Sequence, residues 1–192
     1  MQPKEHANQT GSDARGGLNL LMFVVQTYAV SVEVFLHRRL GERYLGVHGL
    51  CVLLLIPIHA VCWEHHNPMW LTRFWFAYFL ACLVQRVGVL RRYFRGDVTH
   101  SRYTGWPWLL TGNSKWNEVK FKLQFEPALV CFLGFLVFAA NKPFGSYLLT
   151  AGAALFIKNA AYRIGERQRM LNMNDAIMEQ RQRGQNYHNR FQ

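Results

Sequence analysis

Glu33, Arg86 and Glu126 are charged residues inside runs of apolar residues, where a charge needs a partner or a function. Ionisable groups within membrane segments are costly, and they mark ion pairs, proton relays or ion pathways. Glu33 is about one helical turn from Arg38 and Arg39, which favours an ion pair at the membrane boundary. A proton or ion site is the alternative. We expect Arg86 to reach the boundary or to pair with Glu33 or Glu126.

Glu126 stands directly before Pro127 in an apolar run that extends from Phe121 to Ala140. A proline inside a helix removes one hydrogen bond and can kink the helix. Lys122 lies four residues before Glu126, so an ion pair along one face of a helix is the simpler interpretation. A functional carboxylate at a kink is the alternative.

One group of residues near the end of the second apolar run resembles a ligand set, and it contains His59, Glu64, His65 and His66. Imidazole and carboxylate groups can bind zinc, and imidazole can bind haem iron. The spacing matches neither C-x2-C nor H-E-x-x-H, and adjacent histidines at a membrane edge are commonly solvated. These four residues are therefore weak metal candidates, and we expect no cofactor.

The sequence contains no recognisable catalytic motif. His100 and Ser101 are neighbours and Asp97 is near, but adjacent positions do not form a triad, and the G-x-S-x-G elbow is absent. The four cysteines lie inside apolar runs without C-x2-C spacing, so we expect them to fill space in the bundle. The sequence therefore predicts a protein that is not an enzyme.

Five apolar runs contain or flank these residues. They cover Leu18–Leu36, Tyr44–Trp63, Met69–Leu90, Phe121–Ala140 and Pro143–Ile157. A helix needs about 20 residues to cross the hydrocarbon core of a membrane. The mean hydropathy is only −0.05 because the average includes polar ends and a basic loop. We therefore predict an all-α, polytopic transmembrane bundle of about five spans.

The last two runs are short. Their uninterrupted apolar parts, Pro127–Ala140 and Pro143–Ile157, would extend only about 21–23 Å as helices, against about 30 Å for the hydrocarbon core. They cross fully if the helices extend, because the long stems of Lys120, Lys122 and Lys158 can reach the surface. A re-entrant hairpin that turns at residues 141–143 is the alternative.

Positive charge is concentrated in alternate gaps between the runs. Of the 22 Lys and Arg residues, 17 lie in residues 37–43, in residues 91–122 and in the tail after residue 157. Lys and Arg mark the cytoplasmic side of short loops. The sequence therefore predicts a multi-pass protein of the cell (inner or plasma) membrane, with the N-terminus outside and the C-terminus in the cytoplasm.

These patterns divide the chain into three regions. Residues 1–17 are polar and Gly-rich, and we predict that they are disordered. Residues 18–158 form the transmembrane helical domain, which includes a basic and aromatic loop at residues 91–120. Residues 159–192 continue the fifth helix into the cytoplasm as an amphipathic helix that frays at its end.

The loop at residues 91–120 combines basic and aromatic side chains. The residues of interest are Arg91, Arg92, Arg95, Arg102, Trp106, Trp108 and Trp116. Such mixtures bind single-stranded nucleic acid, or they lie in the headgroup layer of a membrane. Because the loop joins two apolar runs, the phosphates closest to it are those of anionic lipid headgroups, not those of nucleic acid. We therefore expect lipid or protein partners here, and nucleic acid is disfavoured.

The tail at residues 159–192 carries a narrow apolar stripe, in which Ile164, Leu171 and Met178 recur every seven residues. A stripe of this kind on a charged helix is typical of a helix that packs against a partner helix. Only two or three heptads are present, so a solvated helix end is the alternative. The sequence leaves open whether the chain forms a homo-oligomer.

The sequence favours an integral membrane subunit that anchors or scaffolds a larger protein assembly through its basic loop and tail helix. The expected partners are the lipid membrane and other membrane or cytoplasmic subunits. A second hypothesis is an oligomeric channel or transporter that uses the intramembrane Glu and Arg residues. The third hypothesis is a membrane-embedded enzyme that acts on lipid, with the histidine group as its candidate cluster.

Overall fold

The computed structural model describes residues 4–38, 40–41, 44–63, 66–96, 105–108 and 121–188. Five α-helices and a π-helical turn make up almost all of these residues, so the all-α class predicted from the sequence is confirmed. The elements are α1 (Lys4–Leu36), β1 (His37–Arg38), α2 (Gly46–Val61), α3 (Met69–Arg95), β2 (Trp106–Pro107), the π-helical turn η2 (Phe121–Phe125), α5 (Glu126–Ala140) and α6 (Lys142–His188).

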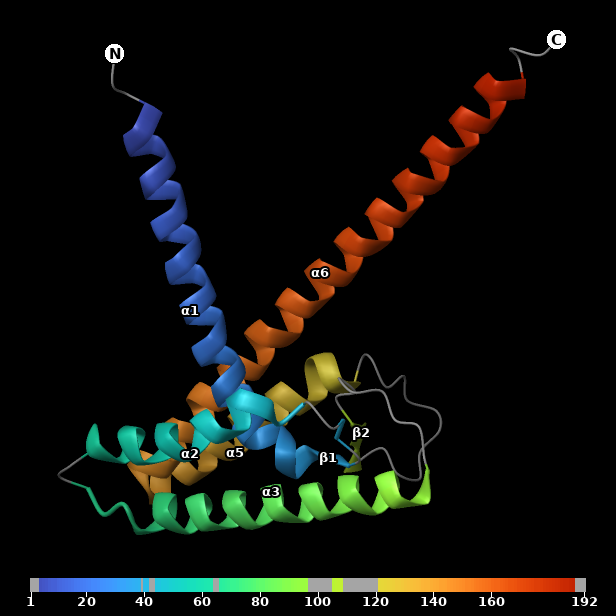
Figure 1. The fold of residues 1–192 in the computed structure, drawn as a ribbon. Coiled ribbons are helices and arrows are strands. Elements are labelled where there is room, and N and C mark those ends of the chain that lie inside the picture. The colour runs from blue at the N-terminus through green and yellow to red at the C-terminus, as the bar shows by residue number, and fades with distance from the viewer. Residues whose placement is uncertain are drawn as a thin grey trace. The chain divides into compact units, whose positions relative to one another are not determined.

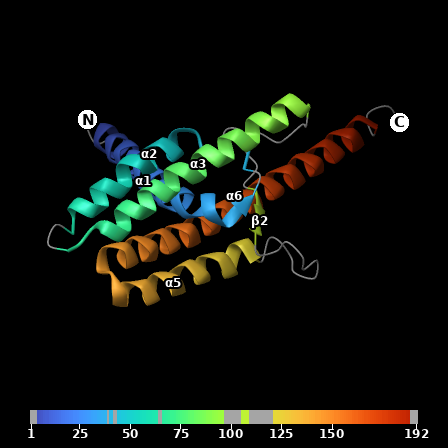
Figure 2. The same ribbon diagram turned by 90° about the horizontal axis from the view of Figure 1, so that it is seen from below.

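The chain divides into two compact units, Met1–Lys158 and Asn159–Gln192. In the first unit, α2 lies beside α3, and α5 lies beside the first part of α6 (Figures 1 and 2). The C-terminal half of α1 contacts both α2 and α3. The core forms where these helices meet, and its most buried side chains include Val52, Ile56 and Tyr78.

Two side chains of α3 bond to the backbone of α2. Pro57 lies inside α2 and lacks the N–H that would bond to the carbonyl of Leu53. The indole N–H of Trp75 donates to that carbonyl instead, at 2.9 Å. The hydroxyl of Tyr78 donates to the carbonyl of Gly49 at 3.0 Å. Because buried backbone groups need partners, these bonds help to fix α3 against α2.

α5 and α6 form a hairpin that turns at Asn141, whose backbone is extended. The side-chain oxygen of Asn141 accepts the N–H of Phe144 at 3.0 Å, as a helix N-cap does. Gly145 allows the two helices to approach closely, because a Cβ atom there would lie 2.3 Å from the Cα of Phe138. The turn therefore lies within the segment, residues 141–143, where the sequence predicts it.

Three helical segments are long and apolar enough to cross a membrane: Gly16–Leu36, Met69–Arg95 and Phe121–Ala140. α2 is apolar but has only 16 residues, or about 24 Å. The segment Phe121–Ala140 has the length of a span because η2 extends α5 at its N-terminal end. By length and composition, the described residues thus contain three candidate spans, fewer than the five that the sequence predicts.

α1 begins at Lys4, whereas the composition of residues 1–17 predicts disorder. Adding residues to an existing helix is much easier than starting one, so the apolar segment can carry the helix into polar sequence. Composition does not reveal this extension, because most residues between 4 and 17 are polar or Gly. Residues 1–3 lie outside the described part of the chain.

Candidate functional site

Five ionisable side chains from distant parts of the chain gather inside the first unit, and we call them the charged cluster. They are Glu33 near the end of α1, His37 in β1, Tyr44 before α2, Glu126 at the start of α5 and Lys158 in α6. Glu33, His37 and Glu126 are each at most 3% exposed. Buried charges are costly unless they are paired, so the contacts within the cluster decide whether it is stable.

Lys158 forms a salt bridge with both carboxylate oxygens of Glu33. Its Nζ lies 2.6 Å from Oε1 and 2.5 Å from Oε2. The hydroxyl of Tyr44 donates a hydrogen bond to Glu33 and accepts one from Lys158 at 2.6 Å. The three side chains satisfy one another, and they join the end of α1 to α6.

His37 and Glu126 form the second pair of the cluster. Nε2 of His37 lies 2.9 Å from Oε2 and 3.1 Å from Oε1 of Glu126. The backbone carbonyl of His37 accepts a hydrogen bond from the side-chain amide of Gln85 on α3, at 3.1 Å. Within the described residues, Nδ1 of His37 is buried without a hydrogen-bond partner. The pair joins β1 to α5, and the bond from Gln85 connects α3 to the same residue, His37.

Two basic side chains beside the cluster bond to backbone carbonyls. Arg92 on α3 donates to the carbonyl of Leu40 at 3.1 Å. Lys122 in η2 donates to the carbonyl of Gly105 at 2.6 Å. Gly105 has a φ of 83°, and a Cβ atom there would lie 2.6 Å from the carbonyl oxygen of Arg38, so only glycine fits this position. These bonds tie α3, η2 and the segment before β2 to the end of the bundle that holds the cluster.

The structure gives new partners to the carboxylates that the sequence singles out. Glu33 contacts Lys158, and Glu126 contacts His37, whereas the sequence suggests basic residues nearby in the chain or Arg86. Arg86 lies on the exposed side of α3. Both carboxylates therefore lie in one cluster, and each is paired with a basic side chain that is remote in the sequence.

Sequence reasoning missed the partners because they are remote in the chain. Glu33 and Lys158 are 125 residues apart, and His37 and Glu126 are 89 residues apart. Helical periodicity relates only residues three or four positions apart. The single available signal is that Lys158 is the cation that ends the fifth apolar run, and this position also suits a residue that reaches toward the membrane surface.

His59 and His66, the described members of the predicted histidine group, contact different side chains. The ring of His59 contacts Tyr28 on α1 and Ser146 on α6. The ring of His66 instead contacts Trp63, with 5.3 Å between the ring centres. Glu64 and His65 lie outside the described residues. Within the described ranges, no group of three His, Cys, Asp or Glu side chains is arranged to hold a metal ion.

The structure describes only part of the basic and aromatic loop. Arg91, Arg92 and Arg95 belong to the last turns of α3, and Arg91 and Arg95 are exposed. The guanidinium carbon of Arg38 lies over the ring of Trp108, 3.7 Å from the centre of the ring. The backbone of Trp106 pairs with that of Arg38 in the two-stranded sheet. Arg102 and Trp116 lie outside the described residues.

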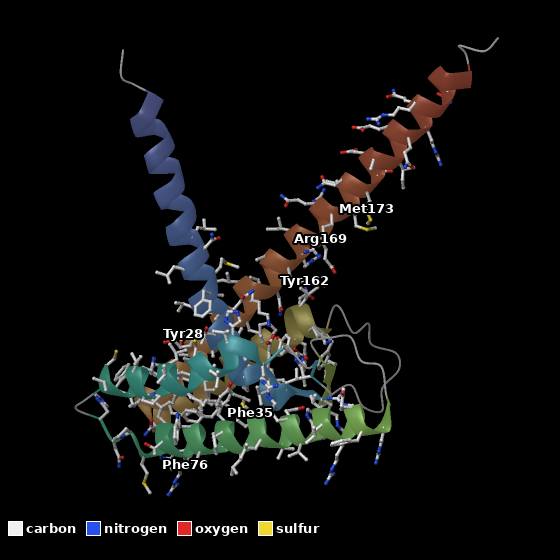
Figure 3. The ribbon with its side chains drawn as sticks, in the orientation of Figure 1. Tyr28, Phe35, Phe76, Tyr162, Arg169 and Met173 are labelled. Atoms are coloured by element: carbon white, nitrogen blue, oxygen red, sulfur yellow. The ribbon has the colours of Figure 1, made fainter. Side chains whose placement is uncertain are left out.

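The predicted tail stripe lies on an exposed helix. Ile164, Leu171 and Met178 are each more than half exposed, and Met173 is equally exposed beside them. Figure 3 shows Tyr162, Arg169 and Met173 on this part of α6. The pKa of Tyr162 is raised, chiefly because its hydroxyl hydrogen-bonds to Glu166. The second unit thus presents a helix on which apolar and charged side chains are both accessible.

Comparison of the chain with protein-family models, with curated proteins and with solved structures found no match.

Proposed function

We propose that this chain is an integral membrane subunit that anchors a larger protein assembly and binds its partner through the tail helix. The observation that carries the proposal is the separate second unit, Asn159–Gln192, whose helix leaves Ile164, Leu171 and Met178 exposed. Apolar side chains at heptad spacing on a charged helix suit packing against another helix. The tail is therefore the docking element.

The first unit supplies the membrane anchor in this proposal. Only 6% of the apolar window of α3 is buried inside the structure, and exposed apolar side chains such as Phe76 and Leu80 line this helix (Figure 3). A water-soluble protein rarely exposes so continuous an apolar surface. Lipid would cover α3, together with the outward faces of α2 and α5.

We further propose that all five apolar runs cross the membrane, with the C-terminus in the cytoplasm. The turn between α5 and α6 lies beside the turn between α2 and α3, because the side-chain amide of Asn141 is 3.4 Å from the carbonyl of Asn67. This contact favours crossing over a re-entrant hairpin, since the two turns reach the same end of the bundle. The opposite end holds the charged cluster, with Arg92 and Lys122 beside it, and this positive charge favours the cytoplasmic side for that end.

The charged cluster supports an anchoring role. Lys158 is the last residue of the first unit, and its salt bridge to Glu33 fixes α6 one residue before the tail begins. A docking helix can transmit force from a bound partner to the membrane only if the end of the helix nearest the membrane is fixed. The internal pairing of both carboxylates also suits a structural clamp more than an open ion path.

The test of this proposal is co-purification in mild detergent. The full-length chain should retain a stoichiometric partner protein, and the variant Ile164→Ser/Leu171→Ser/Met178→Ser should lose it. The matched control is Gln168→Ser/Asn172→Ser/Ala176→Ser, which adds the same number of serines elsewhere on the helix and should keep the partner. Equal recovery with both variants, or no partner with the unchanged chain, would exclude docking through the stripe.

A channel or transporter is the second candidate function, because Glu33 and Glu126 are buried in the part of the chain that we place in the membrane. Reconstitution of the pure protein into vesicles would reveal an ion or proton flux. The transport hypothesis expects Glu126→Gln to abolish that flux. Absence of flux from the unchanged protein would leave anchoring as the better account.

A further inference from the structure

A second group of polar side chains lies between α1, α2 and α6, away from the charged cluster. Nε2 of His59 is 3.1 Å from the hydroxyl oxygen of Ser146, and Nδ1 of the same ring is 3.4 Å from the hydroxyl oxygen of Tyr28. All three side chains belong to residues that are only partly buried. A serine that contacts one ring nitrogen of a histidine, with a polar group on the other, has the arrangement of an activated nucleophile.

The histidine ring is held in place by its neighbours. Its plane is close to perpendicular to the rings of Tyr28 and Tyr147, with ring centres 6.3 Å and 5.2 Å away. Edge-to-face contacts of this kind favour a fixed ring orientation. The hydroxyl of Ser146 also lies 2.9 Å from the carbonyl of Pro143, so rotation about one bond directs its proton to either acceptor. In the tautomer whose Nε2 carries no hydrogen, the ring is positioned to receive that proton.

We propose that Ser146 is a nucleophile for acyl transfer from the ester of a lipid, with His59 as its general base and Tyr28 as a positioning residue. His59 lies two residues before the end of α2, and Ser146 lies four residues after the start of α6. If these helices cross the membrane, both side chains lie about 3–6 Å inside the helix ends. The ester groups of membrane lipids occur at this boundary. The assignment of a lipid ester as the substrate therefore depends on the proposed membrane location. The assignment of Ser146 as the nucleophile does not depend on it.

The reaction balances with water as the only co-reactant. The hydroxyl oxygen of Ser146 attacks the ester carbonyl carbon while its proton moves to Nε2 of His59. The tetrahedral intermediate then breaks its bond to the alcohol oxygen, and the alcohol leaves with the proton from His59. Water attacks the acyl-serine in the same way and releases the carboxylic acid. The N-terminal end of α6 lies near Ser146, and its dipole would favour the negative oxygen of the intermediate.

Covalent labelling of the full-length protein with a fluorophosphonate probe in detergent tests the nucleophile without a known substrate. The probe forms a bond from phosphorus to the serine oxygen and releases fluoride. We expect the adduct on the peptide that contains Ser146, identified by mass spectrometry, and its loss in Ser146→Ala. The control is Thr150→Ala, which removes a hydroxyl one turn along α6 and should label like the unchanged protein.

The base and the positioning residue need separate measurements. We expect His59→Gln to slow labelling about 100-fold or more, the range for loss of a general base. Tyr28→Phe should slow labelling less and should also change its pH profile, whereas a purely structural role would alter unfolding and leave the pH profile unchanged. No adduct on Ser146 in the unchanged protein, or labelling that persists in Ser146→Ala, would overturn the proposal. Neither result bears on docking through the tail, so failure of this site and of the anchoring role are distinguishable.

Discussion

At the scale of single residues, the charged cluster raises the question of how much its ion pairs contribute to the free energy of unfolding. Burial of a charge removes its hydration, and a good partner restores only part of that free energy. Glu33 is nearly inaccessible, whereas the side chain of Lys158 is 16% exposed and lies at the edge. Removal of the lysine would leave the more deeply buried charge without compensation. The pair should therefore behave as a unit, with a large cost for loss of either member alone.

We predict that Lys158→Met destabilises the first unit by about 3–5 kcal/mol, the usual cost of breaking a buried ion pair. The double variant Glu33→Leu/Lys158→Met should recover at least about 2 kcal/mol, because no unpaired charge remains. A denaturant titration in micelles, followed by circular dichroism, measures both values.

The control for this pair is Arg183→Met. Arg183 faces Glu179 at 3.6 Å on the exposed tail, where ion pairs contribute little, so this variant should unfold like the unchanged protein. Equal losses in the single and double variants would mean that Glu33 and Lys158 do not stabilise each other.

Some members of the charged cluster can be predicted from the sequence, and others cannot. Glu33 and Glu126 are recognisable because a carboxylate is rare in an apolar run. His37 and Lys158 stand beside such runs, where basic residues are ordinary. Their roles depend on which helices meet, and a single sequence carries no direct record of contacts between remote residues. The same reason hides the contact between His59 and Ser146.

At the scale of elements, most helices follow from the apolar runs. The sequence places α3 at Met69–Leu90. In the structure α3 continues to Arg95, so its last turns are helical although they contain polar residues. The fourth run has an uninterrupted apolar part of only 14 residues from Pro127. The π-helical turn Phe121–Phe125 lengthens it, and this is a backbone feature that hydropathy does not encode. Helix existence is therefore predictable here, while helix ends depend on local geometry.

We predict that Gly145→Ala strongly destabilises the α5–α6 hairpin. The added Cβ atom would lie within 2.6 Å of three atoms of Phe138, two of them backbone, so one helix must move. Forced overpacking usually costs about 1–3 kcal/mol and occasionally more. Thermal unfolding in detergent measures the change.

Gly88→Ala is the matched control for this substitution. Gly88 lies inside α3 with no neighbouring atom within 4 Å of an added Cβ. Alanine should stabilise the helix there by about 0.5–1 kcal/mol, because it restricts the unfolded chain more than glycine does. If both variants raised the stability, the close approach of α5 and α6 would be excluded.

At the scale of the whole molecule, the two ends of the first unit differ in chemistry. One end holds the charged cluster with Arg92 and Lys122, and the other holds the turns at Asn67 and Asn141. Positive charge remains on the cytoplasmic side when a membrane protein inserts. In the orientation that we propose, the end with the charged cluster therefore faces the cytoplasm.

This orientation is tested by cysteine labelling of intact cells, after replacement of the four native cysteines. We predict that an impermeant maleimide labels His66→Cys and Lys142→Cys from outside, and labels Met170→Cys only after permeabilisation. Labelling at Lys142→Cys distinguishes full crossing by α5 and α6 from a re-entrant hairpin. A re-entrant hairpin would hide this position from the outside, while His66→Cys would stay accessible. The hydrogen bond between Asn141 and Asn67 favours labelling at both positions. Labelling of Met170→Cys in intact cells would reverse the orientation, and it would place the docking helix outside the cytoplasm.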